Sequence, residues 1–259
     1  MPSTGSMNPH RLPPLAAALL GGALLGGCGG GAGEPPPPPP GAIGPGQSIG
    51  SASIAGRVLF RGTPPERRTL KMSGEPACAK SGATALSEEV IVNPDGSLRN
   101  VYVHVVSGLG ERVFAPPREP AEMDQRGCIF VPHVLSVQTD QLIVFKSSDP
   151  VVHNVRAVTG RNRAFNVSMS GHGRTVRRFF PEPEVVGIRC DIHAWMSAWI
   201  AVSDNPFHAV TGESGRFELR GLPAGTYEVE AWHERFGSVR RSVTVAQGEK
   251  REIEIAFGG

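Results

Sequence analysis

CDIHAWM, residues 190–196, places a thiol, an imidazole and a thioether in one short stretch, spaced C-x2-H-x2-M. If these residues lie on a loop, the three side chains can surround one point, and all three are ligands that suit copper. The same residue types are also common in protein interiors, so the stretch alone allows either a metal loop or a packed strand end. The β-type sequence on both sides argues against a helix that would present the three side chains on one face.

A candidate for a fourth ligand lies upstream, in FKSSDPVVHNV, residues 145–155. His153 follows a turn there, 37 residues before Cys190, and both residues adjoin strand-like runs that could be neighbours in a sheet. Blue copper needs two imidazoles and a thiolate in one plane with a weak axial thioether, and the two stretches supply that set. Zinc also accepts imidazoles and a thiolate, but a Met ligand favours copper.

Together the two stretches resemble the cupredoxin family over about residues 125–203. The loop spacing is similar to that of amicyanins, the cupredoxins with the shortest ligand loop. The resemblance implies a Greek-key β-sandwich that binds one type 1 copper. It implies His153, Cys190 and His193 as equatorial ligands and Met196 as the axial ligand.

One position departs from the family pattern. The family usually has Asn at the position of Ser147, where that side chain helps to tie the two ligand loops together. Ser147 can replace it only in part, so the tie between the loops stays an open question. Asn154, directly after the first ligand, agrees with what the family often has.

The chain lacks the residues that copper enzymes need. A binuclear centre requires two bridging thiolates in the loop, where only Cys190 is present, and a trinuclear cluster requires paired H-x-H motifs, of which the sequence has none. The net charge of +2 is too small to indicate a nucleic-acid partner. We therefore expect an electron carrier and not an enzyme. The electron is expected to pass through the Cys190 sulfur or the exposed edge of His193.

Residues 1–28 resemble a bacterial lipoprotein leader. Arg11 precedes an apolar core that is too short and Gly-rich for a stable membrane span, and the core ends in LGGC, residues 25–28. This resemblance to the lipobox implies cleavage before Cys28 and a lipid on its sulfur, which would hold the protein at a membrane surface. The alternative is a plain secretory signal with an incidental Cys, and in either case the mature chain is exported.

Export also bears on the four cysteines, because disulfides persist in oxidising compartments. Cys28 is assigned to the lipid and Cys190 to the ligand loop. A disulfide between Cys78 and Cys128 then leaves no free thiol, and we predict that pair.

From residue 51 onward the sequence predicts an all-β protein, because short runs of Val, Ile, Phe and Thr alternate with Gly, Pro, Asn and Asp. Near the C-terminus, T-x3-G-R-F-x-L followed by LPAGTYEVEA resembles the carboxypeptidase regulatory-like modules, which are small prealbumin-like β-sandwiches. Such modules usually begin with a G-x-V strand, which is missing there but is matched by IAGRVLF, residues 54–60. One hypothesis is therefore that the copper-type domain is inserted between the first and later strands of this module.

We divide the chain into four parts on this basis. They are a signal peptide at 1–28, a disordered Gly/Pro-rich linker at 29–50, a cupredoxin-like domain at 51–203 and a carboxypeptidase regulatory-like module at 204–259. The core of the third part is 125–203, and the strands within 51–106 are also candidates for the second module.

Other polar and aromatic residues are assigned lesser roles. His133 is expected to be structural or to support a ligand, and WHER, residues 232–235, is expected to contact the other domain. Trp195 and Trp199 are expected to pack around the loop, with electron exit as the alternative. Residues 151–180 contain six arginines and no acidic residue, which suits either a solvated face or steering toward an acidic redox partner.

The sequence thus predicts an exported type 1 copper protein that carries one electron at a time at the cell envelope, in the periplasm or at the cell surface. Its expected partners are a redox donor and acceptor, such as a c-type cytochrome or a dehydrogenase, and the membrane through Cys28. The alternative is a cell-surface binding or adhesion lipoprotein in which copper is structural or lost. Copper handling is disfavoured, because the whole chain has only six Met.

Overall fold

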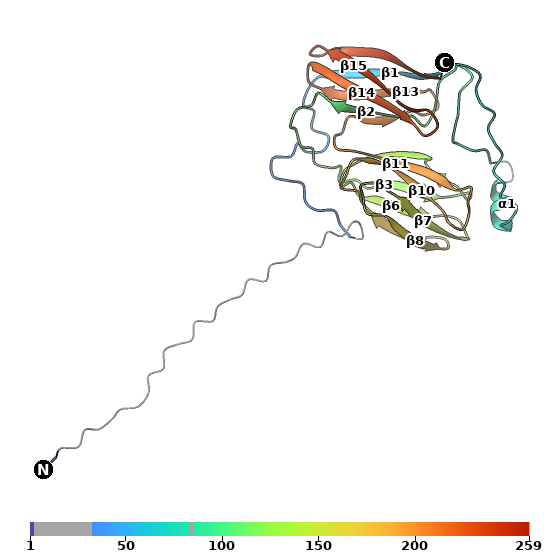
Figure 1. The fold of residues 1–259 in the computed structure, drawn as a ribbon, viewed down its shortest axis with the longest axis horizontal. Helices are drawn as coiled ribbons and strands as arrows, with labels where there is room; N and C mark the ends of the chain where they lie inside the picture. Colours follow the sequence, from blue (N-terminus) through green and yellow to red (C-terminus); the bar gives the residue numbers. More distant parts are fainter. Residues whose placement is uncertain (3–32, 83–84, 259) are drawn as a thin grey trace.

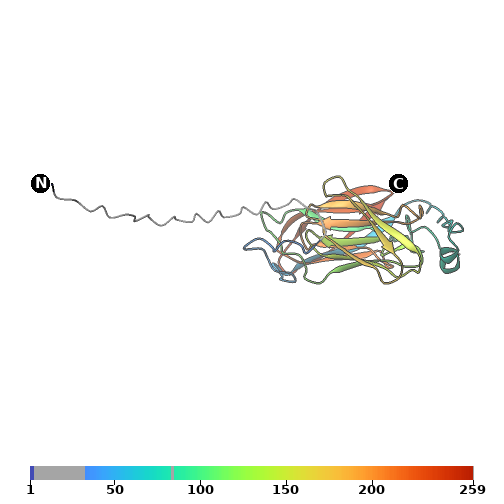
Figure 2. The same cartoon turned by 90° about the horizontal axis from the view of Figure 1, so that it is seen from below.

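The computed structural model describes residues 1–2, 33–82 and 85–258, so Cys28 and nearly all of the predicted leader lie outside the described residues. Two β-sandwiches are stacked on each other in the described part (Figure 1). Its one helix, α1 (Pro76–Gly82), lies at one end of the molecule (Figure 2). The predicted all-β class is confirmed. No helix among the described residues is long and apolar enough to cross a membrane.

The lower sandwich in Figure 1, residues 121–203, carries the predicted ligands and is called the ligand sandwich. It packs a five-stranded sheet of order β5-β11-β10-β7-β8 on a four-stranded sheet of order β4-β3-β6-β9. Its strands are β3 (Ala121–Gln125), β4 (Phe130–Val131), β5 (Val134–Gln138), β6 (Ile143–Ser147), β7 (Val152–Val158), β8 (Phe165–Ser170), β9 (Thr175–Arg178), β10 (Glu184–Arg189) and β11 (Ser197–Ser203). Buried residues such as Phe145, Ile188 and Ile200 fill the space between the two sheets.

The upper sandwich is called the module sandwich. It packs a three-stranded sheet of order β13-β1-β16 on a four-stranded sheet of order β12-β2-β14-β15. Its strands are β1 (Ala52–Phe60), β2 (Tyr102–Ser107), β12 (His208–Val210), β13 (Arg216–Leu222), β14 (Gly225–His233), β15 (Gly237–Val245) and β16 (Lys250–Phe257). Burial alternates along β14, as expected for a strand with one face on a core, and Ile54, Tyr227 and Ile255 lie in that core.

The ligand sandwich is inserted into the module sandwich. β1 pairs antiparallel with β13 and parallel with β16, so residues 54–60 lie in the C-terminal sheet, as the insertion hypothesis requires. The chain leaves the module sandwich after β2 and returns at β12, and these two strands are hydrogen-bonded neighbours. Their pairing brings the two ends of the inserted domain together.

Part of the predicted linker is ordered, which corrects the prediction of a disordered segment over 29–50. Ile43 donates its N–H to the carbonyl of Val113 at 2.9 Å, and its carbonyl accepts the N–H of Ala115 at 2.8 Å. Ile43 and Ile49 also pack against the core of the module sandwich. Two isoleucines in an otherwise Pro- and Gly-rich segment are the physical reason, since their burial favours docking of the chain on the sandwich.

A polar and aromatic cluster joins the two sandwiches. Glu234 contacts Nε2 of His133 through one carboxylate oxygen and accepts the indole N–H of Trp199 with the other, at 2.9 Å. Burial raises the pKa of Glu234, but the bonds from His133 and Trp199 outweigh it and hold the pKa below its usual value. The ring of Trp232 packs edge-on against Trp199, with centroids 5.2 Å apart. The residues 232–235 therefore make the domain contact that the sequence suggested, and His133 has a structural role there.

His233 makes the stability of the module sandwich depend on pH. Its side chain is 1% exposed and stacks on Phe236, and burial lowers its pKa to about 4. The neutral ring accepts the N–H of Arg235 at Nδ1. Because the pKa of the folded state lies below the unfolded value, the neutral ring contributes stability at neutral pH that is lost as the pH falls from about 6.5 toward 4.

We expect the change His233→Gln, which keeps an acceptor but does not titrate, to flatten this pH dependence. Between pH 7 and 4 the native chain should lose up to roughly 3 kcal/mol of unfolding free energy more than the variant. Urea denaturation across this pH range measures the difference. Equal slopes for the two proteins would show that His233 titrates near its ordinary pKa in the folded state.

Candidate metal centre

The sheet topology brings the predicted ligands to one end of the ligand sandwich. His153 lies at the start of β7, and Cys190 directly follows β10, which is hydrogen-bonded to β7. His193 and Met196 lie in the loop between Cys190 and β11. Two backbone hydrogen bonds close this loop: Met196 N–H donates to the His193 carbonyl at 2.9 Å, and Cys190 N–H donates to the Met196 carbonyl at 3.2 Å.

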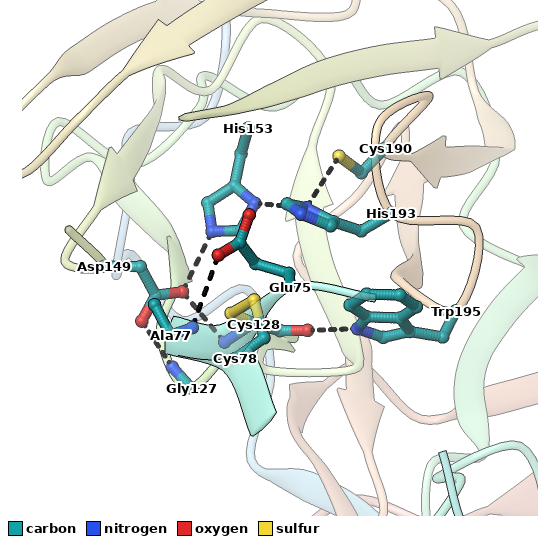
Figure 3. The surroundings of a disulfide bond; sticks show 10 residues. All are labelled: Glu75, Ala77, Cys78, Gly127, Cys128, Asp149, His153, Cys190, His193 and Trp195. Atoms are coloured by element: carbon teal, nitrogen blue, oxygen red, sulfur yellow. Dashed lines mark hydrogen bonds and ion pairs between the residues drawn. A yellow bond between two sulfur atoms is a disulfide. The ribbon is translucent and has the colours of Figure 1, made fainter. Parts of the chain in front are cut away.

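Three of the four predicted ligands converge on one point. Nδ1 of His153 lies 2.9 Å from Nδ1 of His193, and Sγ of Cys190 lies 3.8 Å from the same His193 nitrogen (Figure 3). The three ligand atoms all lie within 4.8 Å of one another, and the three residues are buried. Met196, the predicted axial ligand, is 1% exposed at the end of the same loop. The arrangement can hold one metal ion, with two imidazole nitrogens and a sulfur facing each other.

The electrostatics of the cluster favour the metal-binding form of the thiol. Burial raises the pKa of Cys190. The hydrogen bonds from His153 and from the surrounding backbone N–H groups lower it by more, so the pKa lies below its usual value. A thiolate is the form of Cys that binds metals. Burial and the neighbouring charge of His153 lower the pKa of His193, so that ring keeps a free lone pair.

Asp149 orients the ring of His153, a role that the sequence analysis missed. Its Oδ2 lies 3.0 Å from Nε2 of His153, while its two oxygens also accept the backbone N–H groups of Gly127 at 2.7 Å and Cys128 at 2.8 Å (Figure 3). A carboxylate at Nε2 keeps a proton on that nitrogen, so Nδ1 is the nitrogen that faces the other ligands. Burial tends to lower the pKa of His153, but the bonds to Asp149 and Cys190 raise it to about 9.

The predicted disulfide between Cys78 and Cys128 is confirmed, and it lies beside the cluster. It fastens α1 to the turn between β3 and β4, and among the described residues it leaves Cys190 as the free thiol. Cys128 also contacts both ligand-bearing segments: its N–H donates to Asp149, and its carbonyl accepts the indole N–H of Trp195 at 3.0 Å. One residue thus joins the disulfide to the segment of His153 and to the loop of His193.

The tie between the two ligand loops is made by Asn154 and not by Ser147. Asn154 Oδ1 accepts the backbone N–H of Asp191 at 2.6 Å, and its Nδ2 donates to Asp191 Oδ2 at 3.1 Å and to Asn166 at 2.7 Å. The hydroxyl of Ser147 is buried and has no partner among the described residues. Asn154, directly after His153, therefore makes the tie between the two loops.

His193 does not have the exposed edge that the sequence analysis expected. His193 is only 4% exposed, and its ring packs against the ring of Trp195, with centroids 4.9 Å apart. Figure 3 shows Glu75, the residue before α1, beside the two imidazoles. Trp195 and the segment between β1 and β2, which the disulfide fastens to this end of the sandwich, lie beside the ring.

Comparisons with known proteins match parts of the chain and not its whole length. Residues 197–258 match the model of the carboxypeptidase regulatory-like domain, which confirms that resemblance. The comparison with curated proteins gives no match.

Similar solved structures include an amicyanin from Paracoccus versutus, with 16% identity over 39% of this chain and 97% of that chain and a TM-score of 0.31. A purple cupredoxin from Nitrosopumilus maritimus has 19% identity over 32% of this chain and 99% of its own, with a TM-score of 0.29. A Cu-containing nitrite reductase from Thermus scotoductus has 22% identity over 39% of this chain and a TM-score of 0.32, and the matched part spans only 25% of that protein. The division into two sandwiches rests on the strand pairing of this chain itself.

We expect Asn154→Ala to lower the free energy of unfolding by about 1–3 kcal/mol, because Asp191 N–H loses its acceptor at the junction of the two loops. Ser147→Ala is the matched control on the neighbouring segment. It should change the unfolding free energy by less than about 0.5 kcal/mol, since no protein hydrogen bond is lost. Guanidinium denaturation measures both values. A larger loss for Ser147→Ala than for Asn154→Ala would contradict this assignment of the tie.

Proposed function

We propose that this chain is an exported type 1 copper protein that carries one electron at a time. The observation that supports it best is the convergence of two imidazole Nδ1 atoms and one thiol sulfur within 4.8 Å, in the interior of a β-sandwich. The thioether of Met196 lies buried in the same loop. Two imidazoles, one thiolate and a weak thioether are soft enough to favour copper over zinc.

The residues around the cluster fit a site that changes little when its charge changes. Asp149 holds the ring of His153, Asn154 ties the two loops, and Cys128 connects both to a disulfide. A copper ion bound between these ligands would supply a one-electron couple. Ligands that are locked in place before electron transfer need little rearrangement, and rearrangement is what slows such transfer.

The same burial argues for electron transfer and against chemistry on a substrate. His153, Cys190, His193 and Met196 are all at most 4% exposed, so a fully ligated ion would have no open position for a substrate or for oxygen. Open coordination positions are what catalytic metal sites keep. The chain is therefore proposed as a carrier and not as an enzyme.

The location and partners of the protein are part of this proposal. A lipid on Cys28 would tether the chain to a membrane, and the Pro-rich residues 35–40 would hold the sandwiches away from it in an extended spacer. An electron carrier tethered in this way, in the periplasm or at the cell surface, would meet a redox donor and acceptor such as a c-type cytochrome or a dehydrogenase.

The copper site is tested by the visible spectrum of the chain after titration with Cu(II). We expect one copper per chain and an intense visible thiolate-to-copper charge-transfer band that bleaches reversibly on one-electron reduction. Cys190→Ser should abolish the band, because it removes the thiolate, whereas Ser147→Ala should keep it. A chain that binds no copper, or whose band survives Cys190→Ser, would support the adhesion alternative and overturn the carrier proposal.

The lipid anchor is tested by expressing the full chain in a bacterium and separating membranes from soluble protein. We expect the native chain in the membrane fraction and the Cys28→Ala chain, exported through a cleavable leader, in the soluble fraction. Copper-loaded spectra of the two proteins should be the same, since Cys28 lies far in sequence from the ligands. A native chain that is soluble after export would rule out the anchor.

A further inference from the structure

A groove runs along the ligand loop at the end of the molecule where the predicted copper site lies. One wall is the strap, which we define as residues 61–82, from the end of β1 to the end of α1. Its residues Glu66–Lys71 face Ala194, Trp195 and Ser197 across a space of about 900 Å³. The disulfide at Cys78 holds the far end of the strap against the ligand sandwich.

Trp195 connects this groove to the ligands. The indole ring packs against the ring of His193, with centroids 4.9 Å apart, and the same side chain lines the groove. His193 itself is 4% exposed, so a partner cannot reach its edge directly. The indole N–H of Trp195 donates to the Cys128 carbonyl, and this hydrogen bond fixes the ring in position. A partner bound in the groove would therefore be separated from the predicted ligand His193 only by the indole ring of Trp195.

The groove is predominantly basic. Arg67, Arg68 and Lys71 line it against one acidic residue, Glu66. Arg67 is held by bonds to the carbonyls of Ser87 and Leu86. Arg68 and Lys71 are exposed, and Arg68 pairs with Glu89 at 3.2 Å.

A second hollow of about 520 Å³ also borders Ala194. It carries Arg156 and Arg189 against the one acidic residue Asp191, which already pairs with Arg156. Basic side chains thus outnumber acidic ones in both hollows that border the ligand loop, which favours the approach of a negatively charged partner.

We propose that an acidic protein partner docks in the groove between the strap and the ligand loop and exchanges electrons through Trp195. This inference rests on the proposed one-electron function and adds the place and the charge of the partner. It differs from steering by the arginines of residues 151–180 as a whole, because Arg161 and Arg163 lie in the loop at the opposite end of β7 from His153. The two groups of cations can therefore be tested separately.

The test uses the full, copper-loaded chain in its reduced Cu(I) form and measures the second-order rate at which hexacyanoferrate(III), a small redox anion, oxidises Cu(I) to Cu(II) and is itself reduced to hexacyanoferrate(II). For the double variant Arg68→Glu/Lys71→Glu we expect a roughly tenfold lower rate at low ionic strength, about 10 mM, where charges act over about 30 Å. The difference should shrink strongly at about 0.5 M salt. A cationic cobalt(III) complex should show the opposite change.

The matched control is Arg161→Glu/Arg163→Glu, which changes the charge of the chain by the same amount. Its rate with hexacyanoferrate should fall less than about twofold. Equal effects of the two double variants would overturn the proposal, since only the net charge would then matter. The visible band should be unchanged in both variants; a native chain without the band would instead refute the proposed function itself.

A second measurement separates a protein partner from a small anion. A Glu-rich peptide should inhibit the hexacyanoferrate reaction of the native chain but not that of the Arg68→Glu/Lys71→Glu variant, and a Lys-rich peptide of equal length should inhibit neither. If the Glu-rich peptide fails to inhibit the native chain, the groove attracts small anions only, and the protein docking site is ruled out.

Discussion

The hydrogen bond between Asp149 and His153 is the contact on which the rest of the site depends. Two imidazoles and a thiol are buried close together, and burial of unpaired polar groups is costly. Asp149 offsets that cost at one ring and at the same time accepts the N–H groups of Gly127 and Cys128. The carboxylate therefore fixes the direction of a ligand and anchors the turn that carries the disulfide.

Cys128 links the Asp149 contact to the ligand loop and to the strap at this end of the molecule. Its backbone joins Asp149 on one side and Trp195 on the other, and its sulfur holds the strap across the ligands. The consequence is a site closed to solvent, with His193 behind Trp195. If the chain carries electrons as proposed, they would pass beside the loop, so the groove along the strap and not the His193 edge is the proposed point of contact.

The insertion of one sandwich into the other explains how the strap reaches the site. β1 lies in the sheet of the C-terminal module, so the segment that follows it starts in one sandwich and ends at the other. The buried contacts of Glu234 with His133 and Trp199 hold the two sandwiches against each other. Without a fixed junction, a strap that spans both sandwiches could not hold a constant position over the ligands.

The sequence by itself was enough to predict the all-β class, from its alternating strand and turn residues, and the spacing of the candidate ligands. His153, Cys190 and His193 are expected as ligands because two short motifs resemble the cupredoxins, and the Cys78–Cys128 pair is predicted from cysteine arithmetic. Only the tertiary structure decided that Asn154 replaces Ser147 as the tie, that Asp149 orients His153 and that His193 is covered. These contacts depend on which loops meet at the end of the sandwich. The packing of these loops depends on distant strands, on the disulfide and on the insertion of one sandwich into the other. Local sequence patterns therefore cannot predict it.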